Sequence, residues 1–226
     1  MNKGIQKLKI NRAKVESDRE GFLIEYSKDK NVLHIGCVGT RDIKSKESFH
    51  EKLFSVSSNC IGLDINSQGI KDLKSKNTEF KIIEKSAEDL TDNDIEGENI
   101  DLIILGEVLE HIGNPEKTLK AIANLKNKPE IIITVPNAFG WRNFISMFLS
   151  HKEITRLDHY CYYSFTTLNT LINDCGLKMK DNLYYSLLTD RNIISKSIKK
   201  LIFNKLILSL RPGLSEGIIF ICEKQK

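Results

Sequence analysis

The chain has no uninterrupted apolar stretch of about eighteen residues, so the sequence predicts no membrane-spanning helix. Cysteine is scarce and scattered: the five residues, at positions 37, 60, 161, 175 and 222, are odd in number and form no Cys-x-x-Cys pair. This pattern indicates free thiols in a reducing cytoplasm, with neither a disulfide framework nor a cysteine-based zinc site. The basic N-terminus lacks the hydrophobic core of a secretory signal.

A strong excess of one charge is also missing. The chain has 34 Lys and Arg against 30 Asp and Glu, a net charge of +4. So mild an excess, without a localised basic stripe, argues against a nucleic-acid partner. No internal repeat or low-complexity linker interrupts the 226 residues, and 40% hydrophobic content is enough for one α/β domain with a core.

Short apolar runs alternate with helical patterns, which predicts a mostly parallel sheet covered by helices on both faces. The expected strands are 32–35, 60–63, 79–83, 100–105, 130–135, 177–187 and 217–222. The expected helices are 43–54, 67–76, 114–127, 143–149, a helix capped by Thr166 or Thr167 that ends at Cys175, and 193–210. The last two strands lack a short helical crossover, which favours antiparallel pairing.

A glycine turn and a carboxylate end the first two apolar runs. The turn begins at Gly36, and the second run stops on Asp64. Glycine lets backbone N–H groups approach a ligand, and a carboxylate at the end of a neighbouring parallel strand can accept both hydroxyls of a ribose. Val38 stands where a dinucleotide fingerprint needs glycine, which disfavours NAD and FAD and favours a phosphate-free nucleoside cofactor.

Five segments in order resemble the motifs of class I S-adenosylmethionine-dependent methyltransferases, in the branch that acts on sugars and other small molecules. They are residues 32–37, 62–65, 86–90, 101–112 and 131–137. The resemblance covers residues 30–180 and implies a Rossmann-like fold, with a mostly parallel seven-stranded sheet and an antiparallel late strand. The family usually has acids at the positions of His34 and Ser86, so this cofactor pocket departs from the pattern there.

The resemblance implies S-adenosylmethionine as cofactor and S-adenosylhomocysteine as product. It also implies one domain over 1–226, with a helical segment at 1–29, a cofactor-binding core at 30–136 and acceptor-side segments with the last two strands at 137–226. The implied cofactor-binding residues are Gly36, Cys37, Val38, Asp64, Ile65, Ser86, Ala87, Glu88, Gly106 and Glu107.

A hydroxyl acceptor is best activated by a base of near-neutral pKa, which favours histidine. His159 is the first candidate, because residues 156–163 mix polar and aromatic side chains in a connection that often covers the acceptor in this family. His111 is the second candidate, and a structural histidine is the alternative for both. The expected acceptor-binding residues are Asn137, Trp141, Arg142, Tyr160 and Tyr163, although the segment after residue 137 is equally suited to packing a helix. No cluster of carboxylates and histidines is evident, so no metal ion is expected.

The sequence therefore predicts methyl transfer from S-adenosylmethionine to an oxygen or nitrogen atom of a small molecule. A sugar hydroxyl is the first choice, on a sugar nucleotide or a lipid-linked glycan. An NAD-dependent oxidoreductase or epimerase stays open, weakened by Val38 and by the lack of a Tyr-x-x-x-Lys run. A non-catalytic binding module with the same fold is also open. The helix expected at 193–210 packs on the domain, lies on a membrane or joins a homodimer.

Overall fold

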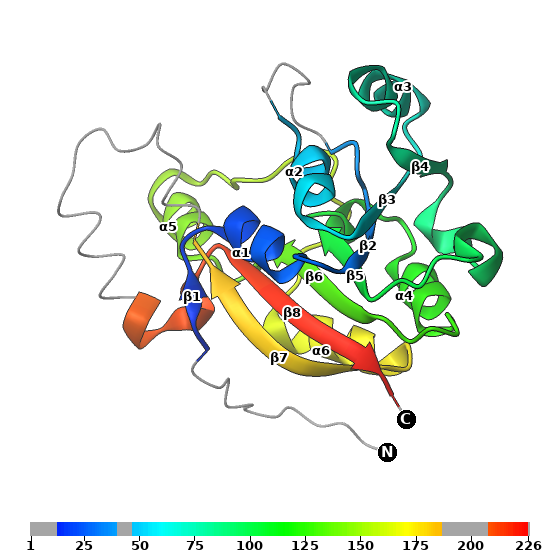
Figure 1. Ribbon diagram of the computed structural model, residues 1–226. Coiled ribbons are helices and arrows are strands. Elements are labelled where there is room, and N and C mark those ends of the chain that lie inside the picture. Colours follow the sequence, from blue (N-terminus) through cyan, green and yellow to red (C-terminus); the bar gives the residue numbers. More distant parts are fainter. Residues whose placement is uncertain (1–12, 40–46, 187–207, 226) are drawn as a thin grey trace.

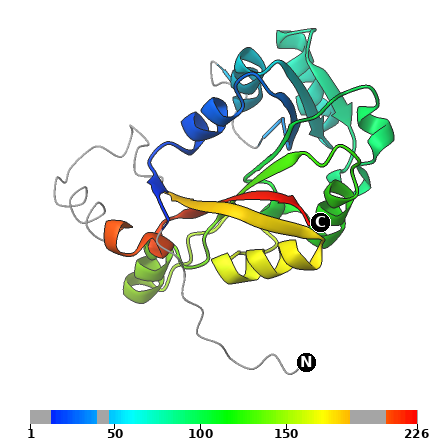
Figure 2. The same cartoon turned by 60° about the horizontal axis from the view of Figure 1, so that its bottom comes forward.

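The structure is a computed structural model that describes residues 13–39, 47–186 and 208–225. Within these ranges one sheet of eight strands runs in the order β1-β7-β8-β6-β5-β2-β3-β4, with helices on both faces (Figures 1 and 2). The strands are β1 (Val15–Glu16), β2 (Asn31–Ile35), β3 (Asn59–Asp64), β4 (Lys81–Glu84), β5 (Leu102–Gly106), β6 (Glu130–Pro136), β7 (Leu177–Tyr185) and β8 (Gly217–Lys224).

The α-helices are α1 (Arg19–Tyr26), α2 (Phe49–Val56), α3 (Ser67–Lys76), α4 (Pro115–Ala123), α5 (Trp141–Ser150) and α6 (Phe165–Asp174). Short 3₁₀ turns are η1 (Ala87–Asp89), η2 (Asp92–Ile95), η3 (Leu109–His111) and η6 (Pro212–Leu214). None of the described helices has the length and apolarity needed to cross a bilayer.

The sheet confirms the expected fold class. Strands β2 to β6 pair in parallel, and β8 runs antiparallel to both of its neighbours, β6 and β7. The expected seven strands are joined by an eighth, β1, a two-residue strand that pairs in parallel with β7 and is too short to give a sequence pattern. Strand β7, which the sequence predicts at the edge of the sheet, is therefore covered by β1 over two residues.

Two apolar layers cover the sheet. On one face, Leu23 of α1 and Leu53 of α2 pack against the side chains of the central strands. On the other face, Leu119 of α4 and Leu168 of α6 close the larger part of the core. Figure 2 shows α1 and α6 on opposite sides of the long strands β7 and β8. Each strand in the centre is therefore buried on both sides, which explains its continuous apolar sequence.

Most expected helices are found, and their ends follow capping chemistry. Helix α3 has the bounds that the sequence predicts, 67–76. Helix α6 is capped by Ser164 instead of Thr166 or Thr167, because the Ser164 hydroxyl accepts from the Thr167 backbone N–H and completes a capping box.

Helices α2 and α4 differ in extent from the sequence expectation. Helix α2 begins only at Phe49, after the cap Ser48, and residues 40–46 lie outside the described residues. Helix α4 ends at Ala123, short of the expected residue 127, as the N–H groups of Asn124 and Leu125 bond three residues back and tighten the last turn. Most of the helix expected at 193–210 also lies outside the described residues.

Two buried histidines face each other beneath α2. His34 of β2 and His50 of α2 are 3% and 0% exposed, and their Nδ1 atoms are 3.2 Å apart. One ring must donate and the other accept, so at least the accepting imidazole is neutral. Burial lowers the pKa of His50 to about 4, and burial together with His50 and Arg19 lowers the pKa of His34.

This pair makes stability depend on pH. The folded-state pKa values lie below those of the unfolded chain, so as the pH falls below about 6.5 the unfolded chain takes up protons that the folded chain refuses. The stability present at neutral pH is therefore lost as the pH falls toward 4. The free energy of unfolding should fall less in His50→Asn, which keeps a hydrogen-bonding atom for His34, than in the wild type. We expect the two losses between about pH 7.5 and about pH 5 to differ by about 2 kcal/mol.

Urea unfolding at a series of pH values measures this difference. His151→Asn is the matched control, because His151 is exposed at the end of α5 in a left-handed conformation that asparagine tolerates. Equal slopes of stability against pH for the wild type and His50→Asn would rule out the buried pair as the source.

Candidate functional site

The carboxyl ends of the parallel strands meet at one edge of the sheet. In the register, Ile35 of β2 lies beside Leu63 of β3 and beside Leu105 of β5. Gly106, the last residue of β5, lies beside Thr134 of β6. All residues expected from sequence to bind the cofactor follow these strand ends, so the fold brings them to one edge.

Gly36 makes the first turn at this edge. Its φ of +76° lies in the left-handed region, and a Cβ there would stand 2.3 Å from Cγ2 of Val108. Its backbone N–H donates to the carbonyl of Leu63 at 2.8 Å, which ties the turn to the end of β3. Only glycine fits this position, because any side chain would meet both strained backbone and the Val108 side chain.

Asp64 is placed as expected, directly beside the glycine turn. One carboxylate oxygen accepts from the backbone N–H of Val38 and the other from that of Asn66, both at 2.9 Å. Each carboxylate oxygen keeps a second lone pair for another donor. The next residue, Ile65, is 72% exposed, so a carboxylate and an apolar side chain stand side by side. This combination suits a ribose next to the flat face of a base.

The turn after β4 lies beside Asp64. The backbone N–H of Lys85 donates to the carbonyl of Asp64 at 3.0 Å. Ser86 accepts from the backbone N–H of Glu88 through its hydroxyl at 3.2 Å, while Ala87 is buried in the core. The segment therefore presents mainly backbone and the half-buried Glu88 toward the site expected for the base.

Glu107, after β5, adopts an unusual conformation. Its φ is +59°, and its backbone N–H is bound by both the carbonyl (3.0 Å) and the hydroxyl (3.1 Å) of Thr134. Its carboxylate accepts from the Tyr185 hydroxyl, and burial and Glu107 raise the pKa of Tyr185. Arg19 donates to the Thr134 hydroxyl at 3.0 Å and lies over the Tyr185 ring at 5.7 Å. Thr134 and Tyr185 are absent from the sequence-based site, because nothing in β6 or β7 marks them.

Glu110, His111 and His159 form a compact group at the same edge. A potential ligand atom from each lies within 4.8 Å of those of the other two. The Nε2 atom of His111 is 4.0 Å from Oε1 of Glu110, and the two imidazole rings are 4.6 Å apart. The backbone N–H of Tyr160 donates to the carbonyl of Glu110 at 2.8 Å, and this bond fixes the 156–160 segment on η3.

This group contains a buried carboxylate. Glu110 is 1% exposed, and neither of its carboxylate oxygens has a hydrogen-bond partner among the described residues. Burial, followed by the charge of Glu107, raises the pKa of Glu110 to about 8. Burial and the neighbouring His111 lower the pKa of His159, whose Nδ1 atom is also buried and unpartnered.

The sequence-based expectation of no carboxylate and histidine cluster is therefore wrong. His111 and His159 do come together as candidates for the acceptor end, but Glu110, which completes the group, is missing from the prediction. The signal was present in the run Leu109-Glu110-His111, where the acid directly precedes the candidate histidine.

The expected acceptor-binding residues are placed unequally. Asn137 is 6% exposed, and its amide donates to the carbonyls of Gly213 and Ser215, both at 2.8 Å. Both amide hydrogens hold the η6 turn, and acceptor binding by Asn137 stays a prediction. Tyr163 is buried in the core, whereas the side chain of Tyr160 is 75% exposed.

Trp141 and Arg142 are half-buried in the first turn of α5. This helix begins two residues earlier than the sequence predicts, at Trp141. Both side chains stay acceptor-binding predictions.

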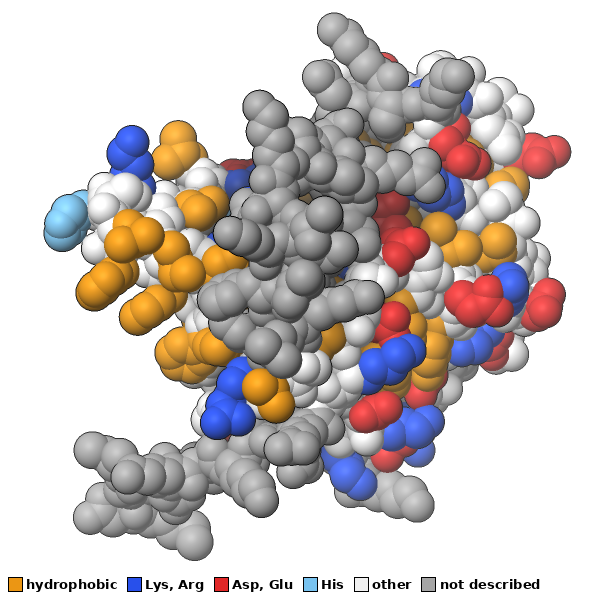
Figure 3. Space-filling view, turned by 90° about the vertical axis from the view of Figure 1, so that its left-hand side faces the viewer, with side chains coloured by type: hydrophobic (Ala, Val, Ile, Leu, Met, Phe, Trp, Pro, Cys, Tyr) orange, Lys and Arg blue, Asp and Glu red, His pale blue; other side chains and the backbone are white. Residues whose placement is uncertain are grey.

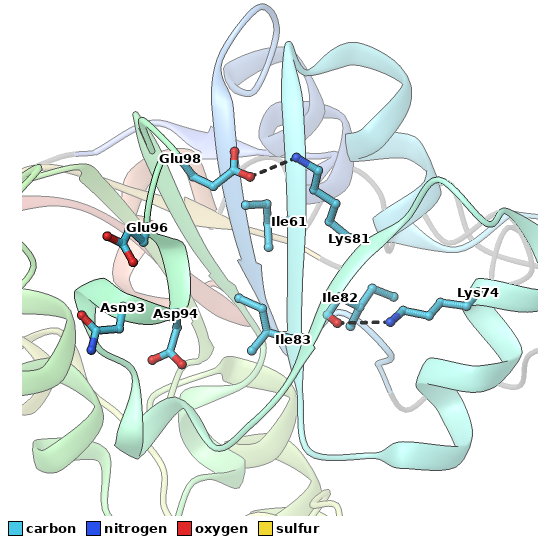
Figure 4. A pocket seen from close by; sticks show the side chains of 9 residues that line it. All are labelled: Ile61, Lys74, Lys81, Ile82, Ile83, Asn93, Asp94, Glu96 and Glu98. Carbon is cyan, nitrogen blue, oxygen red and sulfur yellow. Dashed lines mark hydrogen bonds and ion pairs between the residues drawn. The ribbon is translucent and has the colours of Figure 1, made fainter.

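A separate hollow of about 310 Å³ lies beyond β4 at the edge of the sheet (Figure 4). Most of its charged groups already have partners: Lys81 pairs with Glu98 at 2.9 Å, and Lys74 donates to the carbonyl of Ile82 at 3.3 Å. Asp94 is paired with Lys85 at 2.7 Å. The hollow therefore offers no convergent set of unused polar groups, and the strand ends are the better candidate site.

Comparisons with known proteins identify the family and the fold. The family described as "Methyltransferase domain" matches residues 12–181. A search among curated proteins found no relative. A SAM-dependent methyltransferase from Archaeoglobus fulgidus has a similar structure, with a TM-score of 0.57, 17% identity, and coverage of 91% of this chain and 92% of that chain.

Two further structures are similar. The small RNA methyltransferase HEN1 has a TM-score of 0.62 and 14% identity over 99% of this chain, which spans 27% of that protein. Magnesium protoporphyrin IX methyltransferase from Synechocystis PCC 6803, with bound SAH, has a TM-score of 0.53 and 13% identity over 91% of this chain and 80% of that chain. At these identities the likenesses show the fold alone.

The contacts of Gly36 lead to a stability prediction. Gly39 also has a positive φ, +66°, but has open space where its Cβ would stand. Alanine at either position meets backbone strain of about 1 kcal/mol or more, but only at Gly36 does it also collide with Val108. We expect Gly36→Ala to lower the free energy of unfolding by about 1–3 kcal/mol more than Gly39→Ala, as measured by urea denaturation. Equal losses of unfolding free energy in the two variants would contradict this prediction, because they would show that the Gly36 turn accommodates a Cβ beside Val108.

Proposed function

Because this chain belongs to the methyltransferase-domain family, we propose that it transfers a methyl group from S-adenosylmethionine to an oxygen or nitrogen atom of a small molecule. A sugar hydroxyl is the first choice. One observation carries the proposal: Gly36 and Asp64, which suit a nucleoside, share a sheet edge with the group of Glu110, His111 and His159. Donor and acceptor machinery therefore stand next to each other.

The residues at the strand ends fit the cofactor. The Asp64 carboxylate retains lone pairs for the ribose hydroxyls, and the exposed Ile65 offers an apolar surface for the adenine. Gly36 has no side chain, so Val108 can pack against the turn, and the turn stays tied to Asp64 through the Val38 backbone N–H. When bound, S-adenosylmethionine supplies a methyl group on a positively charged sulfur, which is already activated for displacement, so positioning can supply much of the rate.

The imidazole and carboxylate group supports the acceptor half of the reaction. As the acceptor oxygen forms its bond to the methyl carbon, the electron pair of the S–C bond stays on sulfur and the hydroxyl proton has to leave. His159, with His111 next to it, is the proposed base that accepts this proton. Arg156 binds Asp158 through two bonds of 3.1 Å, which stiffens the segment that carries His159.

The surface beside His159 favours an acceptor with an apolar part. Of the eleven large apolar side chains that are exposed among the described residues, eight lie in the segment 139–160. Helix α5 has no buried residue, and Phe144, Phe148 and Leu149 are at least 70% exposed. Figure 3 shows apolar side chains gathered on one side of the face that contains α5. A lipid-linked sugar uses such a surface, whereas a sugar nucleotide does not.

The oxidoreductase alternative has little support. The side chain of Val38 points at α3, where a Cβ on Gly69 would meet Cγ1 of Val38 at 2.1 Å. Valine and helix therefore pack closely where a pyrophosphate would need a glycine. A non-catalytic module with the same fold stays as an outcome of the binding test.

Cofactor binding is the first test. We expect S-adenosylhomocysteine to bind the purified protein with micromolar affinity in calorimetric titration, and Asp64→Asn to weaken it at least tenfold, about 1.4 kcal/mol. Asparagine keeps the size of Asp64 but has one accepting oxygen in place of two. Asp72→Asn is the control, because Asp72 is an exposed acid on α3 that bonds Gln68. Binding of NAD with none of S-adenosylhomocysteine would contradict the proposal.

The acceptor class has its own test. We expect the double variant Phe144→Ser/Phe148→Ser to lower kcat/KM at least tenfold for a polyprenyl-linked sugar while leaving kcat/KM for the water-soluble head group alone unchanged. The physical reason is the loss of exposed apolar area that would contact the chain of the lipid. Lys178→Ser on the exposed side of β7 is the control. A preference for the nucleotide-linked sugar would overturn the lipid assignment without affecting the cofactor site.

A further inference from the structure

We infer that Glu110, His111 and His159 form a binding site for one divalent transition-metal ion, placed to bind the acceptor. The site lies outside the cofactor contacts described above. It rests on the proposed function only for what the ion does, since its existence follows from the geometry of the three side chains.

The distances allow a single ion to reach all three side chains. Imidazole nitrogens and carboxylate oxygens bind such ions at about 2.1 Å, so ligand atoms around one ion lie about 3–4 Å apart. The three candidate atoms lie within 4.8 Å of one another, and His111 Nε2 is 4.0 Å from Glu110 Oε1. Side-chain movements of about 1 Å are therefore enough to close the site.

The other nitrogen of His111 is already held in the manner typical of a metal ligand. Its Nδ1 atom is 3.1 Å from the carbonyl oxygen of Asp158 and 3.3 Å from the Asp158 carboxylate. A proton on Nδ1 that is donated to Asp158 leaves the lone pair on Nε2, which faces Glu110. Metal-binding histidines are commonly oriented by such a carbonyl or carboxylate, which raises their basicity.

The other two side chains have unused acceptor atoms. The carboxylate of Glu110 is 1% exposed, and both of its oxygens are unpartnered within the described part of the chain. The Nδ1 atom of His159 is also buried and unpartnered there. Ionising Glu110 in such a place without a partner costs several kcal/mol, and a bound cation would offset that cost.

The described cations near this group already have other partners. Arg156 binds the carboxylate of Asp158, and Arg19 donates to the Thr134 hydroxyl. Neither guanidinium has a hydrogen bond to Glu110 among the contacts within the described residues. Neither arginine therefore neutralises Glu110 by direct contact, and a metal ion can bind among the three ligand atoms.

The donor set defines the class of metal. Two imidazoles and one carboxylate suit borderline ions such as Mn²⁺, Fe²⁺, Co²⁺ or Zn²⁺ better than Mg²⁺ or Ca²⁺, which prefer oxygen ligands. Three protein ligands leave open positions for an acceptor. An ion there would orient an acceptor hydroxyl or a pair of adjacent hydroxyls and would lower the pKa of the bound oxygen. With an ion bound, both imidazoles would act as ligands. His159 would then take the role of base proposed above only in the metal-free protein, and in the metal-bound protein the acceptor proton would pass to solvent water.

Titration of the chelator-treated, tag-free protein with Mn²⁺, followed by electron paramagnetic resonance of the free ion, tests the site. We expect one ion per chain and at least tenfold weaker binding in Glu110→Gln and in His159→Gln. Asp72→Asn and His151→Asn, which change an exposed acid and an exposed histidine, serve as matched controls and should bind as the wild type does. With Co²⁺, visible absorption bands of nitrogen ligation should weaken in His159→Gln.

The outcomes separate this inference from the proposed function. S-adenosylhomocysteine titration of each variant reports whether the fold and cofactor site are intact, and His159→Gln serves if Glu110→Gln does not fold. Absence of saturable Mn²⁺ and Co²⁺ binding, or binding that both variants leave unchanged, would overturn the metal site even where the cofactor binds. Metal binding that depends on Glu110, in a protein that fails to bind the cofactor, would support the site and reject the methyltransferase.

Discussion

The structure depends on the shared register of parallel strands β2, β3, β5 and β6, which makes all four end at one edge of the sheet. That register is possible because the strands are buried on both faces and cannot slip by one residue without exposing apolar side chains. It also needs Gly36, whose N–H binds the end of β3 and whose missing Cβ leaves room for Val108. The cofactor residues are neighbours in space because the strands that precede them are neighbours in the sheet.

The acceptor side is held differently, by contacts between loops. The 156–160 segment reaches η3 through one backbone bond, from Tyr160 to the carbonyl of Glu110, and through the contact of His111 with Asp158. Backbone bonds of this kind hold a segment regardless of its side chains, so the segment can vary in sequence while the bond persists. The proposed donor site therefore belongs to the rigid sheet, and the proposed acceptor site belongs to a segment that is attached to it.

This difference explains how far the sequence could predict the structure. Gly36 and Asp64 follow apolar runs directly, so their positions in the chain predict their positions in space. The proximity of Glu110 to His159 depends on how the 156–160 segment docks on η3, and no sequence pattern predicts that docking. Thr134, which binds the Glu107 backbone N–H, was missed because nothing in the sequence of β6 marks it. The two-residue strand β1 was missed because it is shorter than any pattern can register.

The local energetics point to the same place as the geometry. Asn137 and Ser27 are buried polar residues whose side chains bind backbone carbonyls, which makes their burial inexpensive. Glu110, by contrast, is the one carboxylate in the buried class among the described residues, and it follows closely on Glu107, which has a left-handed backbone. The buried carboxylate of Glu110 and the left-handed backbone of Glu107 both cost stability, and neither is needed for the fold. Such features are typical of functional sites. Both lie at the end of β5, next to His111 and His159, which is the place where we propose that a cation and an acceptor bind.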